Sequence, residues 1–193
     1  MIEISEEPFS RLETYGKISI AFRVETILDI TLQRGRLEGW TFVERPVAQP
    51  YVKDYDALSD NGVLDWRQFD LTNWGMLWAK VNGRFLGGAV IAYKTDGLNM
   101  LDGRDDLAVL WDLRVAPQGR RQGIGAALVA ASEAWARQRS CRHLKIETQN
   151  INVAACRFYA SQGYELGGVN RLAYYPELPN ETQLFWYKGF AYK

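Results

Sequence analysis

Residues 115–135 read VAPQGRRQGIGAALVAASEAW, and this stretch decides the fold. The apolar run Leu107–Val115 before it predicts a buried strand, and the spacing of Ile124, Leu128, Ala131 and Trp135 after it predicts a helix. Between them, glycines let the backbone turn tightly and let a ligand approach the main chain. Several N–H groups then converge at the positive end of a helix dipole, so the stretch is a candidate phosphate-binding loop.

Two common phosphate loops fit this stretch poorly. A Walker loop places Lys and then Ser or Thr after its last glycine, where this chain has Ala126 and Ala127. A dinucleotide fingerprint needs a small residue at Leu128 and opens the first βαβ unit of its domain, whereas this loop lies past the middle of the chain. The remaining pattern is Arg120-x-x-Gly123-x-Gly125, preceded by Pro117.

A second motif follows at a defined spacing. After the strand-like run His143–Gln149 comes Asn152-x-x-Ala155-x-x-Phe158-Tyr159, with Gly163 beyond it. Asn152 and Gly163 are also ordinary choices for the start and end of a helix. In this order, the two motifs resemble those of the GNAT superfamily of N-acetyltransferases, which use acetyl-coenzyme A (acetyl-CoA).

The resemblance implies a set of residues that contact the acetyl donor. The main chain around Arg121–Ala126 would hold the diphosphate, and the pantetheine arm would enter a cleft between two splayed parallel strands and bring the thioester next to Tyr159. The full set of expected acetyl-CoA-binding residues is Leu113, Arg114, Val115, Arg120, Arg121, Gln122, Gly123, Ile124, Gly125, Ala126, Asn152, Ala155 and Tyr159.

The expected fold class is α/β (α+β), a mixed, mostly antiparallel sheet with a central parallel strand pair flanked by helices. Asn82-Gly83 lies between the apolar runs 76–81 and 85–93 and predicts a type I′ hairpin. A helix joins strand 107–115 to strand 143–149, so these two should be parallel. Two further strands are expected around 164–170 and 182–190. We expect one domain over residues 1–193, with a variable part at 1–73 and the cofactor-binding core at 74–193.

Composition excludes several functional classes. Lys plus Arg and Asp plus Glu number 23 each, so no overall field favours nucleic acid or an anionic membrane as partner. No stretch resembles a signal peptide or a membrane span, which predicts a cytoplasmic protein. Cys141 and Cys156 are too few for a disulfide scaffold, and with one histidine we expect reduced thiols and no metal site.

The N-terminal quarter is harder to interpret. Alternation at Ile18–Val24 and the run Trp40–Glu44 predict two strands, with Pro46 and Pro50 ending the regularity. Three acidic segments follow along the chain, at 54–70, at 96–106 and at Glu177 with Glu181, and the compensating bases are expected elsewhere. Each segment is either a solvated loop or part of a surface that attracts a cationic substrate.

Acyl transfer to an amine needs a base and an acid. The amine has a pKa of roughly 10.4 and must lose a proton before it attacks. Tyr159 matches the usual acid of the family resembled, although a core aromatic is the alternative. Glu147 and Asp112 are the candidate bases. Asp112 stands in an apolar strand, where burial would raise its pKa. The alternatives are that each is a structural carboxylate and that water relays the proton. Cys156 lacks an activating partner, so direct transfer is preferred to an acyl-cysteine.

Further stretches, such as Glu147-Thr148-Gln149 and Phe185-Trp186-Tyr187, resemble the streptothricin acetyltransferase branch. The expected acceptor is therefore a primary amine of a small cationic molecule such as a streptothricin-type antibiotic. The alternatives are an amine of a protein or peptide, and a non-catalytic acyl-coenzyme A sensor. The loop 95–106 departs from the branch and is expected to border the acceptor site. The sequence is compatible with a monomer or a homodimer.

Overall fold

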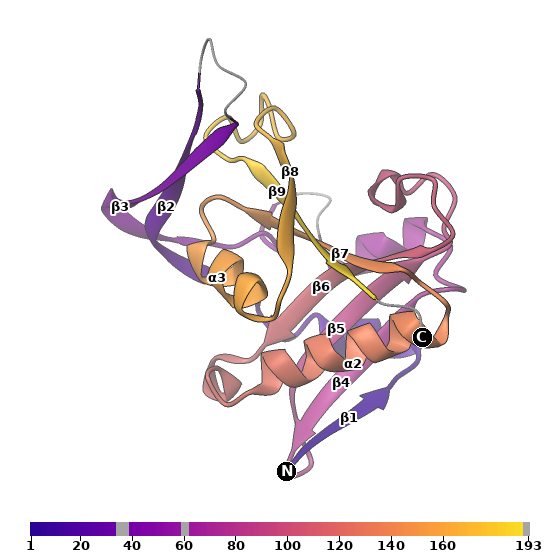
Figure 1. The fold of residues 1–193 in the computed structure, drawn as a ribbon. Coiled ribbons are helices and arrows are strands. Elements are labelled where there is room, and N and C mark those ends of the chain that lie inside the picture. Colours follow the sequence, from indigo (N-terminus) through magenta and orange to yellow (C-terminus); the bar gives the residue numbers. More distant parts are fainter. Residues whose placement is uncertain (34–38, 59–61, 191–193) are drawn as a thin grey trace. The chain divides into compact units, whose positions relative to one another are not determined.

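The computed structural model describes residues 1–33, 39–58 and 62–190. Its strands are β1 (Ile2–Glu6), β2 (Phe22–Leu32), β3 (Trp40–Lys53), β4 (Gly75–Val81), β5 (Arg84–Tyr93), β6 (Leu107–Val115), β7 (His143–Gln149), β8 (Glu165–Asn170) and β9 (Gln183–Gly189). Its α-helices are α1 (Leu12–Tyr15), α2 (Ile124–Gln138) and α3 (Val153–Ser161), and short 3₁₀ turns are η1 (Phe9–Arg11), η2 (Val63–Gln68), η3 (Asn99–Leu101) and η4 (Pro117–Gly119). Figure 1 shows the chain.

The chain divides into two compact units, each described here by itself. The first unit comprises Met1–Ala21, Asp54–Ile146 and Lys188–Lys193, and the second comprises Phe22–Lys53 and Glu147–Tyr187. Strands β7 and β9 each pass from one unit to the other.

The sheet of the first unit has the strand order β1-β4-β5-β6-β7. Neighbours up to β6 are antiparallel, and β6 pairs with β7 in parallel from Leu107↔His143 to Leu110↔Ile146. The β4–β5 turn is the predicted hairpin, with positive φ angles at Asn82 (51°) and Gly83 (74°). The predicted mixed sheet with a parallel pair is therefore confirmed.

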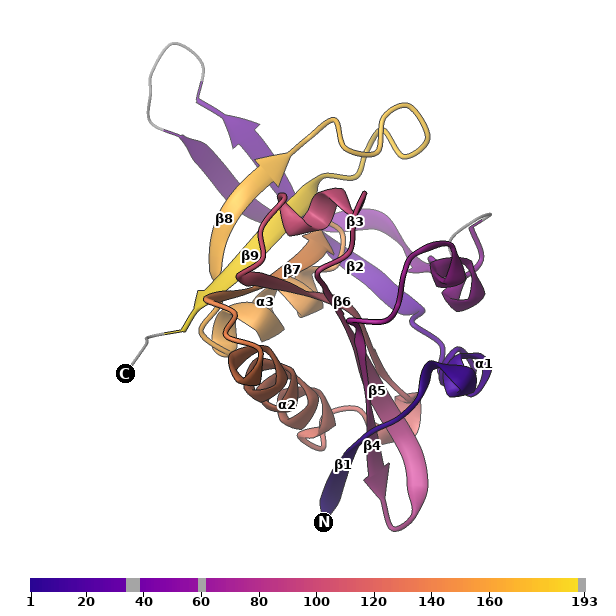
Figure 2. The ribbon, with the colours of Figure 1, turned by 90° about the vertical axis from the view of Figure 1, so that its right-hand side faces the viewer.

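The two faces of this sheet carry different cores. Helix α2 packs on one face and buries Ile124, Leu128 and Trp135. The opposite face carries α1 and an aromatic cluster that includes Tyr15 and Trp66. Figure 2 shows α2 and α1 on opposite sides of β4 and β5. The strand–turn–helix stretch is thus fixed by a strand whose first half is fully buried and by the apolar face of its helix.

The second unit consists of an antiparallel ribbon, β2–β3, with α3 and the antiparallel pair β8–β9. Two N-terminal expectations need correction. The strand predicted at Ile18–Val24 is β2, which begins at Phe22, and β3 continues through both prolines to Lys53. The register shifts between Val24, which pairs with Tyr51, and Thr26, which pairs with Pro46. The ladder is irregular between the two prolines, and a proline, which has no N–H to donate, is tolerated at such an irregularity.

Candidate active site

The candidate phosphate-binding loop lies between the end of β6 and the start of α2. After Val115 the chain turns through η4, and Arg121 (φ 61°) and Gly123 (φ 81°) adopt left-handed backbone conformations before the helix begins at Ile124. Gly123 is the N-cap residue and has no side-chain acceptor, and the N–H of Ala127 bonds to its carbonyl oxygen at 2.9 Å. The N–H groups of the first turn have no intrahelical partner, so they suit an anion.

Two glycines of this loop serve different purposes. A Cβ at Gly119 would lie 2.9 Å from Ile124 Cδ1 and 3.3 Å from Leu86 Cβ, so Gly119 allows close packing. A Cβ at Gly123 would come no nearer than 4.0 Å to another side chain, that of Ile2. Gly123 is therefore required for its backbone conformation, and the space beside it is open to a ligand. These observations fit the diphosphate of a coenzyme.

Adjacent arginines in the loop have different environments. The Arg120 guanidinium donates to the carbonyl oxygens of Val115 (Nε, 3.1 Å) and Ala21 (Nη2, 3.1 Å). Arg121 is exposed, and within residues 1–33, 39–58 and 62–190 its side chain has no hydrogen bond or ion pair. The side chain of Gln122 bonds back to the carbonyl oxygen of Gln118 at 2.7 Å.

Arg114 and Asp112, both expected at the site, have side chains committed to a buried network in the first unit. The Arg114 side chain is 1% exposed and forms bidentate contacts with Asp56 (2.7 and 2.8 Å) and with Asp112 (2.9 and 3.0 Å). It also bonds to the Ile18 carbonyl oxygen at 3.1 Å, and Tyr15 donates to Asp112 at 2.6 Å. Burial and the neighbouring Asp112 carboxylate raise the pKa of Tyr15. The Arg114 guanidinium is therefore engaged by partners within the chain, and Asp112 accepts hydrogen bonds from Tyr15 and Arg114.

In the second unit, α3 presents the second motif. The Asn152 side chain caps the helix by accepting from the N–H of Ala155 at 3.1 Å. Tyr159, one of the buried residues of this helix, packs against Phe158 and Tyr164 with ring centroids 5.1 and 6.0 Å away. The helix and its cap are as predicted. The aromatic packing of Tyr159 is compatible both with a role as proton donor and with a role as a core aromatic residue.

Glu147 lies on β7 among neutral donors. It accepts from the Tyr174 hydroxyl, from Gln183 Nε2 at 2.8 Å and from Gln149 Nε2 at 3.4 Å. Burial and the Glu147 charge raise the pKa of Tyr174, which stays a donor at neutral pH. Within the described ranges no Lys, Arg or His forms an ion pair with Glu147, whereas Glu181 pairs with Lys53 at 2.5 Å.

The cysteine of α3 is poorly suited to nucleophilic catalysis. Cys156 is buried, its Sγ lies 3.4 Å from Thr148 Oγ1, and burial raises the pKa of the thiol. A protonated thiol is a weak nucleophile, which agrees with direct transfer.

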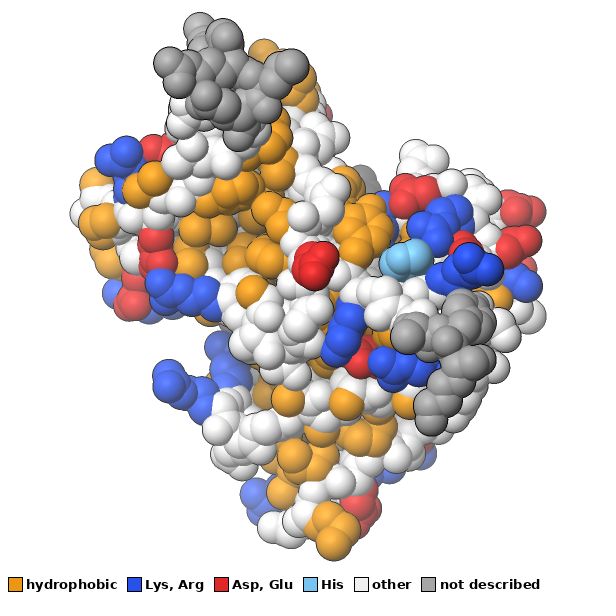
Figure 3. Space-filling view, in the orientation of Figure 1, with side chains coloured by type: hydrophobic (Ala, Val, Ile, Leu, Met, Phe, Trp, Pro, Cys, Tyr) orange, Lys and Arg blue, Asp and Glu red, His pale blue; other side chains and the backbone are white. Residues whose placement is uncertain are grey.

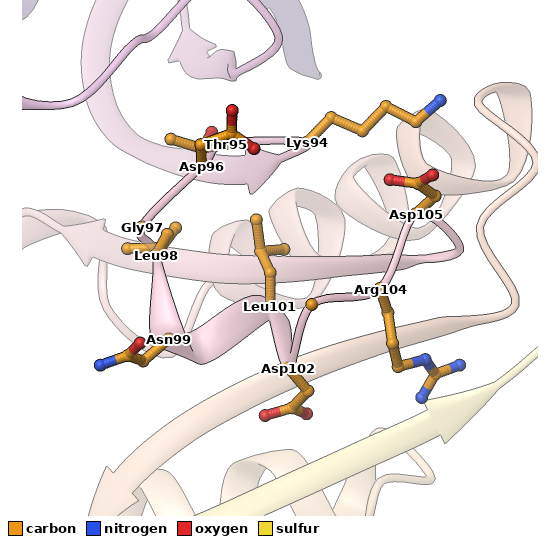
Figure 4. Close-up of a pocket in the computed structure, with 11 residues that line it drawn as sticks. Lys94, Thr95, Asp96, Gly97, Leu98, Asn99, Leu101, Asp102, Arg104 and Asp105 are labelled. Carbon is orange, nitrogen blue, oxygen red and sulfur yellow. The ribbon is translucent and has the colours of Figure 1, made fainter.

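Each unit contains a cavity. A cavity of about 450 Å³ in the first unit is lined by residues of the 94–105 loop, where Lys94 and Asp105 extend to the same side (Figure 4). This loop precedes β6, so the length of the strand, about 27 Å, separates it from the phosphate-binding loop. A larger cavity of about 830 Å³ lies in the second unit between the β2–β3 ribbon and the β8–β9 loop, with Tyr51, Asn150 and Tyr175 among its lining residues. Figure 3 shows hydrophobic side chains gathered over this unit.

Several carboxylates of the acidic segments form ion pairs within the chain. Asp56 pairs with Arg114, Asp102 with Lys145 at 2.9 Å, and Asp106 with Arg104 at 2.8 Å. Other carboxylates cap the backbone: Asp54, Asp65 and Asp70 accept from nearby N–H groups. Asp60 lies outside the described residues. The sequence does not reveal Arg114 and Lys145 as partners, because they lie 58 and 43 residues away from their carboxylates, Asp56 and Asp102.

Neither a metal site nor a membrane span is found in the part of the chain that the structure describes. Among those residues, no group of three or more His, Cys, Asp or Glu side chains is arranged to hold a metal ion. None of the described helices is long and apolar enough to cross a membrane.

Several known proteins are similar to this chain in sequence or in fold. Streptothricin acetyltransferase A of Bacillus subtilis (strain 168) is 28% identical over 153 residues, which cover 78% of this chain and 80% of that protein. Streptothricin acetyltransferase of Escherichia coli is 35% identical over 85 residues, covering 43% of this chain and 49% of that protein. A crystal structure described as a candidate streptothricin acetyltransferase of Bacillus anthracis str. Ames, in complex with acetyl-CoA, has a TM-score of 0.76 and 25% identity and covers 98% of this chain and 100% of that one. The sequence profile of the acetyltransferase (GNAT) family matches residues 40–164, and the chain therefore belongs to this family of acetyltransferases.

Proposed function

We propose that this protein transfers the acetyl group of acetyl-CoA to a primary amine of a streptothricin-type antibiotic. The observation that carries the proposal is the phosphate-binding loop, in which left-handed Gly123 leads into an α-helix whose first N–H groups are available to an anion. Membership of an acetyltransferase family and the names of the similar proteins support the choice of donor and acceptor.

The donor is held by backbone and side-chain groups of this chain. The first-turn N–H groups of Ile124, Gly125 and Ala126 bind the diphosphate, and the end of β6, at Leu113–Val115, offers main-chain groups to the pantetheine arm. Asn152 and Ala155 of α3 complete the set. The bound coenzyme supplies an acetyl thioester, whose carbonyl carbon is the electrophile.

Glu147 is proposed to take the proton from the substrate amine. Its carboxylate is held by three neutral donors and forms no ion pair in the described residues, so an external ammonium group meets an uncompensated negative charge. The proton passes to Glu147 directly or through water. Tyr159 donates a proton to the departing sulfur, and Asp112 acts only in the structure through Arg114 and Tyr15. The reaction is a direct transfer in which residues 1–193 act as one catalytic domain.

A single assay tests this function. Purified protein is incubated with acetyl-CoA and a panel of amines, and free thiol release is followed with a chromogenic disulfide. Streptothricin should release thiol with the highest kcat/KM, ahead of lysine-containing peptides and aminoglycosides. Absence of thiol release with every amine, from a folded protein that binds the coenzyme, would contradict the proposal.

A further inference from the structure

The cavity of about 830 Å³ in the second unit is built around a buried amide. Asn150, directly after β7, is 6% exposed, and its side chain donates to the carbonyl oxygen of Leu28 at 3.0 Å and accepts from the N–H of Thr182 at 2.8 Å. Its main chain bonds to the same two residues at 2.9 and 3.0 Å. Asn150 therefore ties β2 and the β8–β9 loop, residues 171–182, to the end of β7, and hydrogen bonds within the chain hold the walls of the cavity in place.

The lining of this cavity is largely uncharged. Aliphatic side chains and two tyrosines, Tyr51 and Tyr175, supply most of it. Among the described residues that line it, only Asp29 and Arg171 carry a charge, and Asp29 already pairs with Arg45 at 2.8 Å. The volume lies within the usual range of small-molecule sites. The cavity therefore suits an uncharged group of a small molecule better than an ammonium group.

The polar atoms of the lining include several that are available to a ligand. The hydroxyl groups of Tyr51 and Tyr175 and the side-chain amide of Asn180 form no hydrogen bond with the described residues. Burial and the Glu181 carboxylate raise the pKa of Tyr51, so its hydroxyl stays protonated at neutral pH. A tyrosine offers both an apolar ring face and a hydroxyl, which together match a ring that carries hydroxyl or amide groups.

The cavity lies close to Glu147 within the same unit. Asn150 follows Glu147 by three residues, so their Cα atoms are at most about 11 Å apart. The β8–β9 loop also reaches both places, because Tyr174 donates to Glu147 and the next residue, Tyr175, lines the cavity. An amine on an arm of several bonds therefore reaches Glu147 while the rest of its molecule occupies the cavity.

We infer that this cavity binds an uncharged, ring-containing part of the acceptor, whereas Glu147 receives its amine. The inference rests on the proposed function and narrows the acceptor to one class: an amine joined to a sugar or to another ring with hydroxyl or amide groups, in preference to a linear polyamine. Tyr51 and Tyr175 are the specificity-determining residues, because they contact the ring and not the reacting nitrogen. A linear polyamine has no ring to place against them, so it forgoes this contribution to binding.

The experiment compares streptothricin with cadaverine, a linear diamine, in Tyr51→Ala and Tyr175→Ala. Each substitution should lower kcat/KM for streptothricin about tenfold and cadaverine far less, so the ratio of the two constants should fall by nearly that factor. Calorimetric titration of streptothricin in the presence of coenzyme A should show the same loss without catalysis. Tyr175→Phe, which keeps the ring, should retain most of the affinity.

Trp40→Ala is the matched control, because it removes a 38% exposed aromatic side chain of the same β2–β3 ribbon that does not line the cavity. It should leave both rate constants and the affinity unchanged. Tyr51 and Tyr175 are 43% and 66% exposed, so their alanine variants should keep a Tm near that of the wild type.

Three results would overturn the inference: tyrosine variants that bind and acetylate streptothricin like the wild type, an equal loss for both amines, or a wild-type protein that prefers cadaverine. An equal loss would indicate a disturbed site rather than a missing contact. A wild-type protein that binds coenzyme A but acetylates neither amine would instead refute the proposed function.

Discussion

Replacing Asp112 by Asn tests whether Asp112 is a structural carboxylate or a catalytic base. Asp112 accepts three hydrogen bonds, from Tyr15 at 2.6 Å and from Arg114 at 2.9 and 3.0 Å, and its side chain is 10% exposed. The asparagine oxygen can keep the bonds made by the first carboxylate oxygen, those to Tyr15 and to Arg114 Nε. The amide nitrogen replaces the second oxygen and faces the Nη2 donor of Arg114, so one charged hydrogen bond is lost.

The expected cost follows from that count. One hydrogen bond to a charged group is worth about 2 kcal/mol, and Arg114 keeps its second carboxylate partner, Asp56. For a chain of this size, about 2 kcal/mol corresponds to a decrease in Tm of about 4–8 °C. Because Asp112 is not a base in this scheme, kcat of the folded variant should stay within about threefold of wild type.

Thermal unfolding and steady-state kinetics on the same preparation test the expected decrease in Tm and the expected near-constancy of kcat. Rates are taken well below the Tm of the variant, with circular dichroism confirming the fold. Glu147→Gln is the matched comparison, with the same change of group: its amide nitrogen also faces a donor, Gln183 Nε2, so Tm should fall by a similar amount, but kcat should fall on the order of 10²-fold. If Asp112→Asn loses 10²-fold in kcat while its Tm is unchanged, Asp112 is catalytic and the structural assignment is wrong.

Three further outcomes are expected. Tyr159→Phe keeps the buried ring but removes the hydroxyl, so kcat should drop on the order of 10²-fold while calorimetry shows an unchanged coenzyme Kd; an unaltered kcat with chemistry rate-limiting would assign Tyr159 to packing. Gly123→Val should abolish coenzyme binding and Gly123→Asn should retain it, because asparagine tolerates the φ of 81° and valine does not; equal affinities in calorimetry would contradict this. Burial raises the pKa of Cys141 to about 11, so its reaction with a chromogenic disulfide should be slow at pH 8 and accelerate roughly tenfold per pH unit up to that value; rapid labelling of the folded protein at pH 8 would refute the burial argument.

Local patterns in the sequence were sufficient for most of the sheet. The apolar run Leu107–Val115 coincides with β6, His143–Gln149 with β7, and the Asn82-Gly83 turn with the β4–β5 hairpin. These features are decided within a few residues by turn chemistry and by burial of the strands. The β2–β3 ribbon was less predictable, because β3 tolerates Pro46 and Pro50 only through a register shift that depends on its partner strand.

The networks around the site could not be predicted, because their members are distant in sequence. Tyr15 and Asp112 are 97 residues apart, and Lys53 and Glu181 are 128 residues apart. A carboxylate in an apolar strand predicts a special environment, but the sequence does not say whether a cation has been placed beside it. For Asp112 the structure places Arg114 beside it, and this contact supports the proposal that Asp112 is a structural residue.

Individual carboxylates, rather than whole acidic segments, are therefore the groups expected to attract a cationic acceptor. Asp56, Asp102 and Glu181 come from the three acidic segments, and each has a basic partner on the same chain, so part of the charge of each segment is compensated. Glu147 differs, because its described donors are the neutral groups of Tyr174, Gln183 and Gln149. Neutral donors orient a carboxylate without cancelling its charge, so its attraction for an ammonium group acts at short range, where an amine must give up its proton.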